Sequence, residues 1–150
     1  MCICTFLGHR DCTFTIKPIV KTIIEDLILT NKIDHFYVGN HGNFDNIVIQ
    51  TLKELKEKYP QINYSIVLAY LPHSRDHAPF LQSNTIFPDG IERIPKRFAI
   101  SYANRWMIEK SNYVVTFLAH SLGNTAKFIK AAQQKNKIVI NIASIFEKYP

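Results

Sequence analysis

Apolar positions follow two spacings along this chain: short, nearly unbroken runs, and longer stretches in which they recur every three or four residues. Short runs bounded by turn residues predict buried strands, and the three-to-four-residue recurrence predicts amphipathic helices. We expect strands at residues 2–7, 35–38, 63–71, 113–118 and 138–142. We expect helices at about residues 15–31, 44–59, 97–110 and 124–135. This alternation predicts one domain over residues 1–150, a Rossmann-like three-layer α/β/α sandwich with a five-stranded, mostly parallel sheet.

One segment, residues 73–96, fits neither spacing and contains several proline residues and a glycine. It is longer than most loops inside a compact domain, so we expect a lid or a binding segment. At its start His73 and His77 stand four residues apart with Asp76 between them. Flanking prolines and the lack of a third ligand argue against a metal site. We therefore expect neither a metal nor a cofactor.

Composition and charge narrow the class of protein. The 150 residues carry a formal net charge of +6, which favours an anionic partner without identifying it. No apolar run approaches the roughly 18 residues that a membrane helix needs, and the first residues lack the features of a signal peptide. Three cysteines form neither a disulfide framework nor a zinc pattern. We expect a cytoplasmic protein with reduced thiols and no membrane partner.

Three of the predicted strand-to-helix connections combine glycine with polar side chains. These residues are Gly8, His9 and Arg10 in the first connection, Gly39, Asn40, Gly42, Asn43 and Asp45 in the second, and His120, Ser121, Gly123, Asn124 and Thr125 in the third. Because the carboxyl ends of parallel strands meet at one edge of a sheet, we expect the three connections to converge there. Glycine lets a ligand approach the backbone closely, and helix N-termini bind phosphate. The sequence therefore predicts a nucleotide-sized pocket at this edge.

Each residue of this set also has a purely structural interpretation. Gly39 and Gly42 are also typical of ordinary turns, and Asp45 could cap a helix instead of accepting a hydrogen bond from a ribose hydroxyl. His9 and His120 could form a general acid/base pair, or they could simply donate hydrogen bonds to a ligand or to the backbone. The joint presence of three such connections favours the ligand-binding interpretation.

Four segments of the chain resemble a known family. They are residues 4–10 (CTFLGHR), 36–45 (FYVGNHGNFD), 66–72 (IVLAYLP) and 98–107 (FAISYANRWM). In this order they resemble the short, YpsA-like branch of the SLOG superfamily of Rossmann-like proteins, which is related to the Lonely Guy (LOG) phosphoribohydrolases and to the DNA-processing protein DprA. The resemblance covers nearly the whole chain and implies a nucleotide-derived ligand at the three connections and a homo-oligomer.

The LOG enzymes cleave the N-glycosidic bond of nucleoside 5′-monophosphates with an arginine and a motif glutamate. The resemblance makes Arg105, which follows Asn104, the counterpart of that arginine, but Lys127 stands where the glutamate is expected. A lysine cannot stabilise the positive charge of an oxocarbenium-like transition state. Glu109, one turn beyond Arg105, is a candidate replacement, or else a solvent-facing partner of that residue.

These observations favour binding of a nucleotide or a nucleotide-derived small molecule, for sensing or sequestration, over its turnover. A LOG-like phosphoribohydrolase that uses Arg105 and Glu109 is the alternative. Single-stranded DNA binding, as in DprA, is a third hypothesis. A modest charge excess and the lack of a basic stripe interleaved with aromatic residues argue against a nucleic acid partner.

Overall fold

The computed structural model describes residues 2–9, 12–70, 84–117 and 124–144, with the backbone alone at Asn124. Six strands form one sheet in the order β4-β3-β2-β1-β5-β6, and every neighbouring pair is parallel. They are β1 (Ile3–Gly8), β2 (His35–Val38), β3 (Asn63–Val67), β4 (Thr85–Ile86), β5 (Tyr113–Phe117) and β6 (Ile138–Asn141). The predicted α/β class with a parallel sheet is confirmed.

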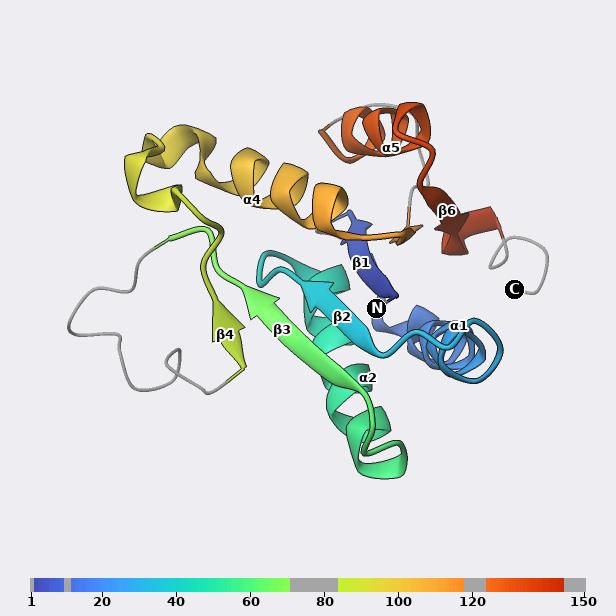
Figure 1. Ribbon diagram of the computed structural model, residues 1–150. Coiled ribbons are helices and arrows are strands. Elements are labelled where there is room, and N and C mark those ends of the chain that lie inside the picture. The colour runs from blue at the N-terminus through green and yellow to red at the C-terminus, as the bar shows by residue number, and fades with distance from the viewer. Residues whose placement is uncertain (1, 10–11, 71–83, 118–123, 145–150) are drawn as a thin grey trace.

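Helices cover both faces of this sheet (Figure 1). The helices are α1 (Lys17–Thr30), α2 (Asn43–Lys58), α4 (Lys96–Lys110) and α5 (Asn124–Gln134), with 3-10 turns η1 (Phe14–Ile16) and η2 (Ile91–Arg93). Alternate residues of β1 point to opposite faces: Cys4 and Phe6 belong to the core under α1 and α2, whereas Leu7 packs with residues of α4 and α5. The predicted three layers are therefore present.

The sheet has six strands, so the expectation of five was one short. The additional strand, β4, lies within the connection predicted at residues 73–96 and pairs with the end of β3 through Ile66↔Thr85 and Val67↔Ile86. Two residues cannot carry an alternating pattern, and their pairing is set by the neighbouring strand alone. The predicted strand at residues 63–71 is also shorter than expected, because regular pairing with β2 and β4 stops at Val67.

Helix boundaries follow local chemistry. The helix predicted from residue 15 begins as the 3-10 turn η1 and becomes α-helical at Lys17, with Pro18 in the first turn, where no backbone donor is needed. Helix α2 begins at Asn43 after Gly42, whose positive φ of 97° is accessible to glycine at little cost. The first residues of α1 and α2 thus fix where the connections from β1 and β2 end, at the edge of the sheet formed by the carboxyl ends of the strands.

Candidate functional site

A cavity of about 560 Å³, which we call the rim cavity, opens at the carboxyl ends of the central strands. Its lining comes from the ends of β1, β2 and β3 and from helices α2, α4 and α5: Leu7, Gly8, His9, Gly39, His41, Asp45, Val67, Arg97, Ile100, Ser101, Ala103, Asn104, Met107, Thr125 and Phe128. Strand β1 lies between β2 and β5, so the order of strands reverses beside this cavity. Open parallel sheets bind ligands at such a position. The volume falls within the roughly 300–1,000 Å³ of small-molecule sites.

The end of β1 supplies Gly8 and His9 to the cavity. A Cβ at Gly8 would lie 2.4 Å from Cγ of Phe44, the second residue of α2, so glycine is required here by packing. His9 is 9% exposed; its backbone N–H donates to the carbonyl of Phe117 at 3.4 Å, and its ring meets the Phe117 ring edge-on. Both residues are thus held in fixed positions beside the cavity.

The connection after β2 is held by the carboxylate of Asp45. The backbone N–H of His41 donates to Oδ2 of Asp45 at 2.9 Å, and a Cβ at Gly39 would approach the same oxygen to 2.9 Å. A carboxylate in the first turn of α2 also interacts favourably with the helix dipole. Gly42 is the N-cap residue of α2 and no side chain caps the helix, so Asp45 is not a cap. It is a first-turn carboxylate that holds the preceding connection, and its side chain also lines the cavity.

Two asparagines of the same connection have different surroundings. Nδ2 of Asn43 donates to the carbonyl of Cys12 at 3.2 Å, which ties the connection after β1 to the start of α2. Oδ1 of Asn40 is buried and accepts no hydrogen bond from the described residues. Neither residue is among those that line the cavity. The cavity-facing groups of this connection are Gly39, His41 and Asp45.

Helix α4 contributes a polar stripe that the sequence analysis did not single out. Arg97, Ser101 and Asn104 stand four and three residues apart, on one side of the helix, and all three line the cavity. Only Asn104 was predicted from the sequence. The signal for the other two was their spacing relative to Asn104, and His41 was missed although it lies inside a predicted connection. Thr125, on α5, also lines the cavity; its predicted contact with a ligand stays a prediction.

Arg105 and Glu109 are not among the residues that line the rim cavity. Arg105 and Lys127 line a second groove of about 300 Å³ between α4 and α5, which we call the helical groove. Oε1 of Glu109 accepts a hydrogen bond from Nζ of Lys135 at 3.0 Å, and its side chain is 58% exposed. The structure thus separates the two candidate catalytic residues from the cavity that contains most of the other described candidates.

Several predicted residues lie outside the described part of the chain. These are Arg10, His120, Ser121, Gly123 and the residues His73, Asp76 and His77; of Asn124 only the backbone is described. Within the described residues, no group of three His, Cys, Asp or Glu side chains could hold a metal ion. Among the same residues, no helix combines the length and the apolar character needed to cross a membrane.

Comparison of the sequence with family models and with curated proteins gives no match. The resemblance to the SLOG superfamily and the homo-oligomer that it implies therefore stay predictions. The cytoplasmic location, expected from the first residues and the cysteines, also stays a prediction.

Proposed function

We propose that the chain binds a nucleotide or a nucleotide-derived small molecule in the rim cavity. The observation that carries this proposal is the position of a 560 Å³ cavity at the point where strand order reverses, between connections that contain Gly8 and Gly39. Its polar groups can serve both parts of such a ligand, because Arg97 can pair with phosphate while Asn104 and Ser101 can hydrogen-bond sugar or base. Sensing or sequestration of a nucleotide fits a cavity whose described lining includes neither Arg105 nor Glu109.

Binding is favoured over hydrolysis by the location of Arg105 and Glu109. Both lie outside the cavity lining, and Glu109 is engaged with Lys135. A glycoside hydrolase needs its carboxylate next to the scissile bond. A LOG-like activity remains the alternative function, and it predicts release of free base from nucleoside 5′-monophosphates that is abolished in the Arg105→Ala variant.

A thermal-shift panel of nucleoside mono-, di- and cyclic phosphates and ADP-ribose tests the proposal. A ligand at 100 times its Kd stabilises the folded state by about 2.7 kcal/mol, which raises the Tm of a chain of this size by about 5–10 °C. The Asn104→Ala variant should weaken binding of the best nucleotide about 2- to 10-fold, because it removes one cavity-facing hydrogen-bonding group.

Asn46→Ala is the matched control, since Asn46 is exposed on α2 and does not line the cavity. It should bind the nucleotide with unchanged affinity. The proposal is wrong if no nucleotide in the panel raises the Tm, or if the Asn104→Ala and Asn46→Ala variants bind the best one equally well. Free base in the same incubations, lost on substitution of Arg105, would show that the site hydrolyses its ligand.

A further inference from the structure

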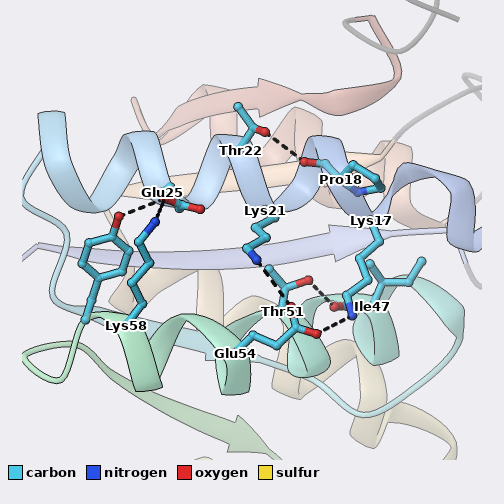
Figure 2. A network of polar contacts seen from close by, with 10 residues as sticks. Lys17, Pro18, Lys21, Thr22, Glu25, Ile47, Thr51, Glu54 and Lys58 are labelled. Atoms are coloured by element: carbon cyan, nitrogen blue, oxygen red, sulfur yellow. Dashed lines mark hydrogen bonds and ion pairs between the residues drawn. The ribbon is translucent and has the colours of Figure 1, made fainter.

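Positive charge is distributed unequally between the two helical layers. Residues 17–58, which include α1 and α2, contain six Lys and six Asp or Glu residues and are neutral overall. Ion pairs join the two helices: Lys17 to Glu54 at 2.7 Å, Lys21 to Glu54 at 3.8 Å, and Lys58 to Glu25 at 3.2 Å (Figure 2). Charge on this side of the sheet is thus matched within the molecule.

The opposite layer has no such balance. Residues 96–137, which include α4 and α5, contain eight Lys or Arg residues and one acidic residue, Glu109, giving a net charge of +7 where the whole chain carries +6. The excess positive charge of the protein therefore lies in this layer. Unmatched charge on one side of a protein attracts anions to that side.

The helical groove gathers part of this charge in a concave site. Its lining is Arg105 and Ile108 from α4, Lys127, Phe128 and Ala131 from α5, and Lys135 just beyond α5. Within the described residues, neither Arg105 nor Lys127 forms an ion pair, and the one carboxylate nearby, that of Glu109, contacts Lys135. Two cations from different helices thus line one groove with no described carboxylate paired to them.

The helical groove adjoins the rim cavity. Phe128 lines both, and the neighbouring residues Asn104 and Arg105 line the cavity and the groove respectively. A ligand held in the cavity by Asn104 and Thr125 would therefore need to extend only past the Phe128 ring to reach Arg105 and Lys127. An arginine fork and a lysine ammonium suit a phosphate group better than any neutral group.

We propose that the helical groove is a second anion site, which takes a further phosphate of the ligand whose nucleotide part occupies the rim cavity. The ligand class is then a nucleotide with at least two phosphate-bearing positions, rather than a monophosphate. This inference rests on the proposed function of the rim cavity and names the substrate class for it.

The test compares nucleotides that differ by one phosphate. The probes are the 5′-monophosphates of adenosine and guanosine, their 5′-diphosphates and their 3′,5′-bisphosphates, titrated by calorimetry into the 150-residue chain. For one base, a probe with two phosphates should bind about 10-fold or more tightly than its monophosphate, because it adds charge-assisted hydrogen bonds. In the Lys127→Gln and Arg105→Gln variants this gain should disappear while monophosphate affinity stays unchanged.

Lys53→Gln is the matched control, because Lys53 is an exposed lysine of α2 on the opposite layer. It should retain the full gain. Circular dichroism checks the folding of the two groove variants and of the control, and Lys135→Gln provides a further groove variant should either of the first two unfold.

The outcomes separate the two proposals. If monophosphates bind but a second phosphate adds no affinity, or if the gain survives in both groove variants, the second site is wrong and the rim cavity proposal stands. If Lys127→Gln weakens the monophosphate equally, the groove belongs to a single site and the inference is also wrong. If no probe binds, both proposals fail. A single-stranded hexanucleotide that binds more tightly than every bisphosphate would assign the groove to a nucleic acid strand and overturn the small-ligand inference.

Discussion

Replacing Gly8 by alanine tests whether this glycine is required by packing or by a ligand. An added Cβ would lie 2.4 Å from Cγ and 2.5 Å from Cδ2 of Phe44, whereas favourable carbon–carbon contacts are at about 3.5–4.0 Å. Phe44 is 1% exposed, so its ring is covered by protein and cannot simply swing into solvent. Either strand β1 or the Phe44 ring must therefore move by about 1 Å. Overpacking of this kind costs about 1–3 kcal/mol of unfolding free energy.

Urea denaturation and thermal melting measure this cost. We expect the Gly8→Ala variant to lose about 1–3 kcal/mol of unfolding free energy, or about 2–12 °C in Tm, without any ligand present. The Phe44→Ala change alone should cost about 3–5 kcal/mol. Combined with it, the Gly8→Ala cost should shrink but not vanish, because Cβ of Phe44 itself lies 2.9 Å from the new methyl group.

The packing explanation would be refuted by a Gly8→Ala variant as stable as the parent protein, or by strictly additive costs in the double variant. Contacting residues that share one space should couple energetically. A stable variant that no longer binds nucleotide would instead show that Gly8 is needed for the close approach of the ligand. The same measurement therefore separates the two roles of this residue.

Two further predictions concern titrating groups. The side chain of Glu25 accepts hydrogen bonds from Tyr59 Oη at 2.9 Å and from Lys58 Nζ, and these lower its pKa. The stability that they supply should therefore be complete above 4.5, the ordinary pKa of the group. It should be lost as pH falls through the lower pKa that Glu25 has in the folded state. By urea denaturation, Glu25→Gln should thus cost up to about 1 kcal/mol at pH 7, and the cost should shrink as pH falls below 4.5. A cost that does not change with pH would contradict this. Burial raises the pKa of the Cys4 thiol, whereas Cys2 is partly exposed. Alkylation of the native protein, followed by mass spectrometry, should therefore modify Cys2 well before Cys4. Equal rates of alkylation would contradict the buried position of Cys4.

Much of the fold could be predicted because apolar periodicity is strong where elements are buried. Helix α2 is an example: Ile47, Val48, Leu52 and Leu55 are fully buried at helical spacing, and the predicted range differs from the observed one by a single residue at each end. Strand β4 could not be predicted, because its two residues depend on pairing with β3 for their conformation. Tertiary pairing, not local pattern, decides such short elements.

The lining of the rim cavity was predictable at the level of connections and less so at the level of single side chains. Parallel topology brings the ends of β1 and β2 together, so Gly8, His9, Gly39 and Asp45 were found from their positions after strands. Which residues of α4 face the cavity could not be predicted from the sequence in the same way. Successive residues of a helix point about 100° apart, so Asn104 faces the rim cavity while Arg105 faces the helical groove.

The central position of β1 has a consequence for the order of folding. Its partner β2 follows within one helix, with Thr5 opposite Tyr37, but its other partner β5 comes much later, with Cys4 opposite Tyr113. During synthesis, β1 to β4 with α1 and α2 can associate while β5 is still unmade, which leaves one edge of β1 open. Closing that edge is a long-range step with a large loop-closure entropy, and such steps slow folding. Substitutions in the β1–β5 pairing should therefore affect the late phase of refolding, and those between β1 and β2 the early phase.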